Sequence, residues 1–103
     1  MDPEINPTAP ITVAGTYWFP QRTYGEGAFV EFAGTFGTGT VQIVYKDLAG
    51  ATTPFKDLDG AVKTFTAANF VGVDVPKSGL IGLTVTVAGG TSLKAALHSA
   101  KDL

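Results

Sequence analysis

The sequence contains no cysteine, only one histidine and only one methionine. The absence of cysteine excludes a disulfide framework and thiolate chemistry. The net charge is −2 at pH 7, which argues against a nucleic-acid-binding protein that depends on counterion release. No apolar run approaches the ~18 residues of a membrane-spanning helix. We therefore expect neither a nucleic-acid partner nor a membrane partner.

The first ten residues, MDPEINPTAP, hold three prolines and lack the basic and apolar parts of a signal peptide. Proline is excluded from helix interiors and from central strands. We expect residues 1–10 to form either an extended arm, with Pro3, Ile5 and Pro7 contacting a partner, or a disordered terminus. Residues 11–103 are enough for a single domain with one core.

Thirteen glycines, together with many threonines and valines, indicate strands and turns rather than helices. Ile81, Leu83 and Val85 alternate with smaller or polar residues, which predicts a strand with one buried face. Similar runs recur at a turn spacing of about ten residues, which is typical of an antiparallel β-sandwich. They lie at residues 11–19, 28–35, 40–46, 62–66, 70–75 and 92–100. The predicted fold is all-β: a jelly-roll or Ig-like sandwich of seven or eight short strands.

Two hairpins follow from keeping the apolar residues of neighbouring strands on one face. The first would join residues 28–35 to residues 40–46, pair Phe32 with Ile43, and turn on Gly37-Thr38.

The second hairpin would join residues 79–87 to residues 92–100, pair Val85 with Ala95, and turn on Gly89-Gly90-Thr91. Residues 92–100 have an alternative. They are rich in alanine, leucine and lysine, and their first residue is a serine that could cap a short helix. Alternation favours the strand.

The alternation on each strand also predicts which apolar side chains are buried and which face the solvent. Ile43, Val73, Leu83 and Val85 should lie in the core. Phe29 and Val44 should lie on the outer face, either as an exposed apolar patch that contacts a partner or in a second packed layer.

The densest aromatic cluster comprises Tyr17, Trp18 and Phe19, with Tyr24 nearby. Tryptophan and tyrosine dominate interface hot spots, so Tyr17, Trp18 and Tyr24 are candidate partner-binding residues. The alternative is a plug that closes one end of the sandwich, since large aromatic side chains are mostly buried.

The sequence offers no set of residues for catalysis or metal binding. His98 is the only histidine and is expected on the solvent-exposed face of a strand. Ser99 beside it would face the opposite way, so the two cannot form a nucleophile pair. Residues 57–60, DLDG, resemble part of a calcium loop, but Phe55 and Thr66 stand where oxygen ligands are needed. We expect a turn there, and a chain that is not an enzyme and has no cofactor and no metal.

Three segments resemble a group of small tailed-bacteriophage proteins: FAGTFGTGTVQIVYKD, DLDGAVKTFTA and VDVPKSGLIGLTVTVAGGTSLKAAL. The resemblance implies a virion component, above all a capsid decoration (cement) protein on the capsid surface. Its partner would be the major capsid protein, and its assembly an oligomer, with a trimer as the implied state. No functional residue is carried over, because the likeness lies in turns and core.

The alternative function is a carbohydrate-binding or adhesin domain of a phage tail fibre. In that reading, Tyr17 and Trp18 would be exposed and would stack on sugar rings.

Overall fold

The computed structural model describes residues 5, 8–56 and 62–99. This part of the chain is all-β, with eight strands and no helix, and so no helix that could cross a membrane. The strands are β1 (Gly15–Trp18), β2 (Gly27–Thr35), β3 (Thr40–Lys46), β4 (Thr52–Pro54), β5 (Thr64–Phe65), β6 (Asn69–Asp74), β7 (Ile81–Thr86) and β8 (Ser92–Ser99).

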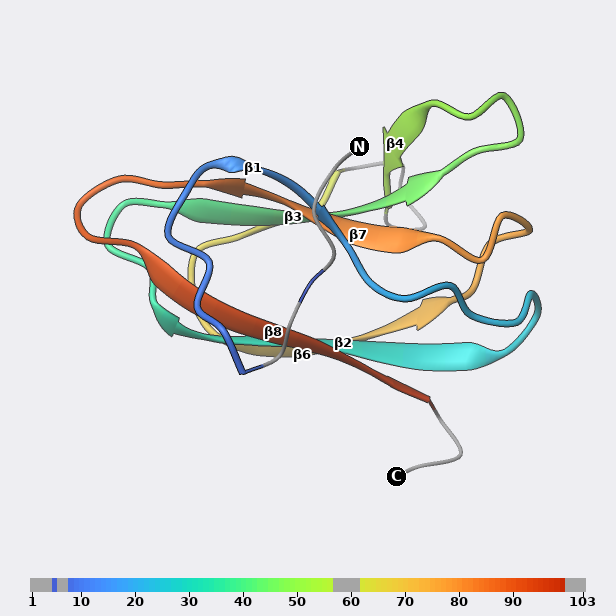
Figure 1. Cartoon of the computed structure of the whole chain (residues 1–103), viewed down its shortest axis with the longest axis horizontal. Coiled ribbons are helices and arrows are strands. Elements are labelled where there is room, and N and C mark those ends of the chain that lie inside the picture. The colour runs from blue at the N-terminus through green and yellow to red at the C-terminus, as the bar shows by residue number, and fades with distance from the viewer. Residues whose placement is uncertain (1–4, 6–7, 57–61, 100–103) are drawn as a thin grey trace.

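The strands form two antiparallel sheets that lie one above the other (Figure 1). The larger sheet, sheet A, has the order β1-β7-β3-β4, and β5 pairs with β3 beside β4. The smaller sheet, sheet B, has the order β6-β2-β8. The predicted all-β sandwich is confirmed.

Alternating apolar residues of both sheets meet between the layers. The largest fully buried side chains come from β2, β3, β7 and β8, and they are Val30, Phe32, Val41, Ile43, Ile81, Leu83, Val85 and Leu93. The predicted burial of Ile43, Leu83 and Val85 is therefore confirmed. Val73 is only half-buried and packs against the edge of this core.

Both predicted hairpins are wrong. β2 pairs with β6 and β8 in sheet B, whereas β3 pairs with β7, β4 and β5 in sheet A. β7 and β8 likewise belong to different sheets. Alternation determines which face of a strand is buried, but two strands that face each other across a core satisfy it as well as two neighbours in one sheet. Residues 92–99 are nevertheless a strand, so the alternative of a helix is wrong.

The predicted turns are instead two connections that cross between the sheets, side by side at one end of the sandwich (Figure 1). Thr38 N donates to the carbonyl of Ala88 at 3.0 Å and joins the two connections. Gly37 has a φ of +58°, and a Cβ there would lie 2.5 Å from the Ala88 oxygen. Only glycine fits this close approach of two backbones without displacing one of them.

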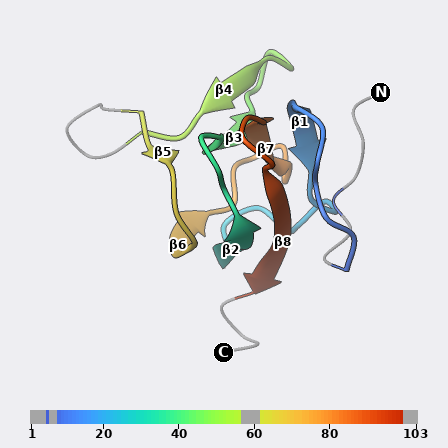
Figure 2. The same cartoon turned by 90° about the vertical axis from the view of Figure 1, so that its left-hand side faces the viewer.

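The N-terminal segment closes one open side of the sandwich, next to β1 and β8 (Figure 2). Ile5 N donates to the carbonyl of Trp18 at 2.7 Å, and Ile11 exchanges backbone hydrogen bonds with Leu93. Ile5 and Ile11 are 5% and 6% exposed and belong to the core. The prediction that Ile5 contacts a partner is therefore wrong, because its own domain buries it. Pro3 and Pro7 lie outside the described residues.

Candidate binding surfaces

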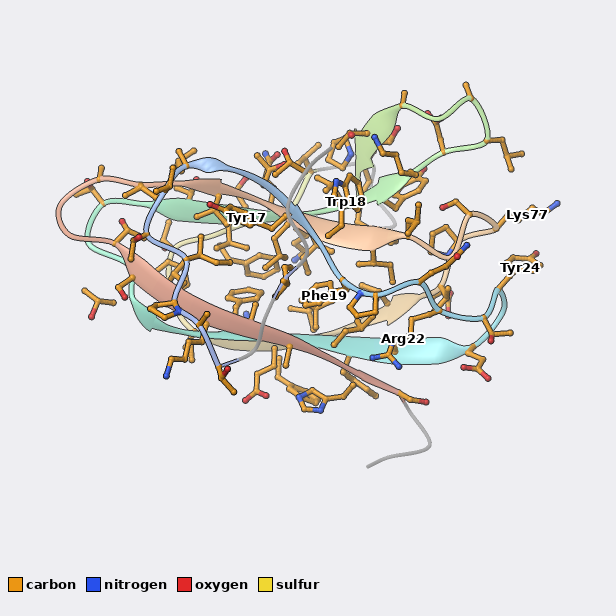
Figure 3. All side chains as sticks on the ribbon, in the orientation of Figure 1. Tyr17, Trp18, Phe19, Arg22, Tyr24 and Lys77 are labelled. Carbon is orange, nitrogen blue, oxygen red and sulfur yellow. The ribbon has the colours of Figure 1, made fainter. Side chains whose placement is uncertain are left out.

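The aromatic cluster of the N-terminal third divides between the two faces of β1 (Figure 3). Tyr17 faces inward and packs against the core, and its hydroxyl donates to the carbonyl of Val13. Phe19 follows the strand and is 3% exposed. Successive side chains of a strand point to opposite faces, so Tyr17 and Trp18 cannot form one platform for a sugar. For Tyr17 and Phe19, the interpretation as a plug is the correct one.

Trp18 lies on the outer face of sheet A, in one row with Gly82 and Val44 across three strands. A Cβ on Gly82 would lie 2.7 Å from the Trp18 ring, so the indole lies directly over this glycine. Lys46 Nζ lies 5.0 Å from the centre of the indole. Val44 is only 2% exposed, and its predicted role in an exposed patch is wrong. The outer face has its own packed layer beside the tryptophan, so the alternative of a second packed layer is the correct one for Val44.

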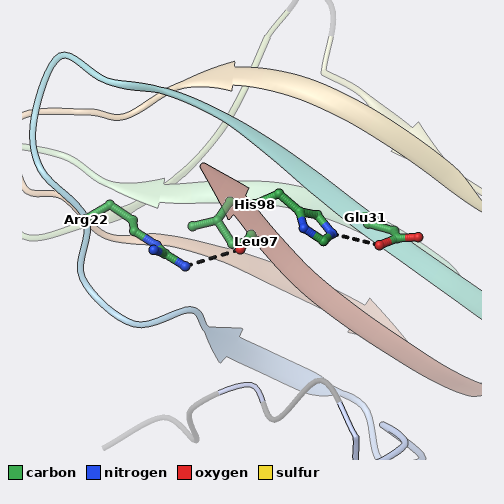
Figure 4. Close-up of polar contacts among 4 residues, drawn as sticks. All are labelled: Arg22, Glu31, Leu97 and His98. Atoms are coloured by element: carbon green, nitrogen blue, oxygen red, sulfur yellow. Dashed lines mark hydrogen bonds and ion pairs between the residues drawn. The ribbon is translucent and has the colours of Figure 1, made fainter. Parts of the chain in front are cut away.

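Tyr24 is the one residue of the predicted aromatic set that is exposed, at 59%. It lies in the loop between β1 and β2, and Lys77 Nζ lies 5.8 Å from the centre of its ring (Figure 3). Polar contacts hold this loop against the rest of the domain. Arg22 Nη2 donates to the carbonyl of Leu97 at 3.2 Å (Figure 4). Gln21 Nε2 donates to the carbonyl of Ser78 at 2.9 Å.

Tyr24 borders a hollow of about 530 Å³, which we call the Tyr24 hollow. Its wall includes the rings of Tyr45 and Phe55, whose centres lie 4.8 Å apart, and further lining residues include Pro54, Lys56, Asp74 and Pro76. In the described part of the chain, neither Lys56 nor Asp74 has an ion-pair partner. Small-molecule sites are typically concave, mostly apolar and of about 300–1,000 Å³, with a few polar groups, and this hollow has those properties.

A second group of aromatic side chains lies on the outer face of sheet B. Phe29 and Phe70 stack with ring centres 5.0 Å apart and planes at 16°. The imidazole of His98 lies 5.6 Å from Phe70, and its Nε2 is 2.8 Å from Glu31 Oε1 (Figure 4). We call these four residues the sheet B patch. Phe70 is 45% exposed, whereas Phe29 is half-buried beneath its neighbours.

The outward position of Phe29 is confirmed, but its predicted neighbours on β3 are wrong, because β6 and β8 flank it. The sequence-based predictions do not include Phe70 in this outer-face group. Its alternation with the inward Val71 and Val73 would place it on the same solvent-exposed face.

His98 lies at the surface as predicted. Among the described residues, no three histidine, cysteine, aspartate or glutamate side chains gather as a metal site would require. The partial calcium pattern at 57–60 lies outside the described residues.

Neither a family model, nor a curated protein, nor a solved structure matches this chain. A β-sandwich hosts many unrelated functions, so the fold alone assigns none. Function is therefore inferred from the surfaces above and from the sequence resemblance.

Proposed function

We propose that this chain is a non-enzymatic structural protein of a tailed-bacteriophage virion, which decorates the capsid surface and binds the major capsid protein through the Tyr24 hollow. The resemblance of the three segments to small phage proteins supports the virion assignment. The single structural observation that supports the binding role is the exposed Tyr24 beside a concave aromatic wall.

Tyr24 is suited to anchoring a partner. Tyrosine gives a large contact area with one polar end, and it is enriched at interface hot spots. Arg22 and Gln21 already hold its loop against neighbouring segments. Binding therefore costs little additional ordering of the backbone, which favours affinity. A projecting loop or side chain of the shell would occupy the hollow, in contact with Tyr24 and Phe55 of its lining.

The proposed protein acts in several copies on a capsid. The net charge of −2 gives little long-range repulsion between neighbouring copies. The trimeric state is implied by the resemblance alone, and no feature of the sandwich specifies three copies. A contact between copies that is based on the structure is argued in the next subsection.

The test is co-sedimentation of the purified chain with undecorated capsids of the phage that encodes it. Tyr24→Ser should weaken binding at least ~10-fold, since loss of a hot-spot residue costs about 2 kcal/mol or more. Val13→Ser is the matched control, because Val13 is 67% exposed and is not part of the hollow. Equal binding by Tyr24→Ser and by the unaltered chain would exclude the hollow as the contact. Failure of the unaltered chain to bind capsids would contradict the decoration role.

A carbohydrate-binding role is the second candidate, and the same hollow favours it. Aromatic faces for the C–H groups of a sugar lie beside Lys56 and Asp74, which could bond its hydroxyl groups. Binding to a glycan array that is lost in Tyr24→Ser, together with no binding to capsids, would make the adhesin domain of a tail fibre the better assignment.

A further inference from the structure

β6 is the longest edge strand whose outer side has no backbone hydrogen-bond partner in the described part of the chain. The other edge strands are short or already have a hydrogen-bond partner on part of their outer side. Ile5 bonds to β1 at Trp18, and Ile11 bonds to β8 at Leu93. β4 has three residues including a proline, and β5 has two. Natural proteins protect exposed edges because the unpaired backbone groups can pair with another strand.

The unpaired groups of β6 can be identified from its hydrogen bonds to the β2 side. Val75 N donates to the carbonyl of Glu26, and the Val75 carbonyl accepts from Gly25 N. Backbone groups alternate in direction along a strand, so those of Val71 and Val73 also point toward β2. The backbone N–H and C=O groups of Phe70, Gly72 and Asp74 point away from β2, toward the open edge of the sheet. In agreement, Phe70 N donates to the side chain of its own neighbour Asn69 at 2.8 Å rather than to a strand.

The sheet B patch reaches this same edge. Phe70 belongs to β6, is 45% exposed, and stacks on Phe29 of the adjacent strand. The edge therefore combines outward backbone groups with an exposed aromatic ring, in a strand whose sequence is NFVGVD and whose only charge is Asp74. These two independent features match a single kind of occupant, which is an added β-strand.

We propose that the occupant is β6 of a second copy, in antiparallel pairing about a two-fold axis at Val71. The two three-stranded sheets then become one six-stranded sheet. Phe70 of each copy pairs with Gly72 of the other through the outward backbone groups, and the side chain of Asn69 gives up its bond to Phe70 N. The ring of Phe29 already lies against Gly72 on the outer face of the sheet. Phe70 of the second copy therefore meets Phe29, and four phenylalanine rings form one apolar cluster.

The charges of the strand favour this register. The two Asp74 carboxylates lie at opposite ends of the paired region, about 20 Å apart along the strands at ~3.4 Å per residue. A two-fold axis at Gly72 would instead set Phe70 directly opposite Asp74 of the second copy, where the ring removes water from the carboxylate. The Val71 register avoids this cost. The pairing does not depend on the virion assignment.

Sedimentation equilibrium of the full chain tests the pairing. We expect a concentration-dependent dimer, and Phe70→Lys should raise its dissociation constant by at least ~10-fold. Leu48→Lys is the matched control, since Leu48 is 82% exposed in the turn between β3 and β4 and should not alter the dimer. A monomer at all concentrations would overturn the proposal, and so would a trimer or a dimer unaffected by Phe70→Lys. A strand from another protein would then be the alternative occupant.

A cysteine variant tests the register, because the chain has no cysteine of its own. The Cα atoms of a non-hydrogen-bonded antiparallel pair lie about 4.5 Å apart, within the disulfide range. Oxidised glutathione should therefore convert Val71→Cys to a disulfide-linked dimer much faster than it converts Val13→Cys. Circular dichroism verifies that both variants fold. Equal rates of linkage would contradict the axis at Val71.

Discussion

The Thr91 hydroxyl lies 2.6 Å from the carbonyl oxygen of Phe36, so it joins two connections that are far apart in sequence. The same hydroxyl accepts a hydrogen bond from Ala88 N at 3.0 Å, and Thr91 is only 3% exposed. It is the buried polar residue that holds the β2–β3 and β7–β8 connections together at one end of the sandwich.

Thr91→Val should therefore destabilise the fold although it preserves shape. The valine removes the buried hydrogen bond to the Phe36 carbonyl and leaves the part-buried Ala88 N–H without its partner, which together cost about 1–3 kcal/mol. Urea unfolding measures this difference. Thr12→Val is the matched control at an exposed threonine and should change stability by less than ~0.5 kcal/mol. A Thr91→Val variant as stable as the parent would show that the hydroxyl does not help to hold the two connections together.

Ile5→Ala should cost about 2–5 kcal/mol in the free energy of unfolding, because Ile5 belongs to the core and the truncation leaves a cavity. Deletion of residues 1–8 should destabilise the domain by a similar amount. Chemical denaturation decides between this result and a free arm. If either change leaves the unfolding midpoint unaltered, the N-terminal segment does not close the sandwich. Val13→Ala, at an exposed position, is the control.

Leu83→Ala should also cost about 2–5 kcal/mol, since Leu83 is 1% exposed at the centre of sheet A. Guanidinium unfolding gives the value. A loss below ~1 kcal/mol would be inconsistent with the assigned inner face of β7.

Stability should depend on pH through Asp47. The N–H of Ala51 and the hydroxyl of Thr53 bond its carboxylate and hold the pKa of Asp47 below its ordinary value. A lowered folded-state pKa stabilises the fold above the unfolded value of about 3.9, and this contribution is lost as the pH falls through the folded pKa. The parent should be more stable than Asp47→Asn at about pH 6, and the difference should shrink at about pH 2.5.

Thermal unfolding of both chains at the two pH values measures this effect. Asp74→Asn controls for the loss of one surface charge. A difference between parent and Asp47→Asn that does not change with pH would contradict the role of the ionised carboxylate.

The sequence predicts the faces of the strands well, because burial imposes a period of two on each strand independently of its neighbours. The inward positions of Ile43, Leu83 and Val85 follow from this period alone. Strand partners do not follow, because residues 37–38 and 89–91 could equally turn a hairpin or cross between sheets. The crossing depends on contacts between the two connections, such as Thr38 with Ala88, and these are long-range.

The candidate surfaces were predictable only in part, for a related reason. The exposure of Tyr24 depends on a loop held by Arg22 and Gln21, whose acceptors lie far away in the sequence. β3 alone leaves open whether Val44 is exposed or lies in a second packed layer, because the indole of Trp18 in the same row lies two strands away. Ile5 lies among prolines that favour an exposed arm, and only the gap beside β1 gives it a buried position.

Electron cryomicroscopy of capsids mixed with the full chain tests the central claim most directly. We expect density for the sandwich on the outer surface of the shell, with Tyr24 and the hollow beside it against the major capsid protein. Capsids that carry no such density after mixing, or a sandwich attached through the outer face of sheet A, would contradict the proposed function.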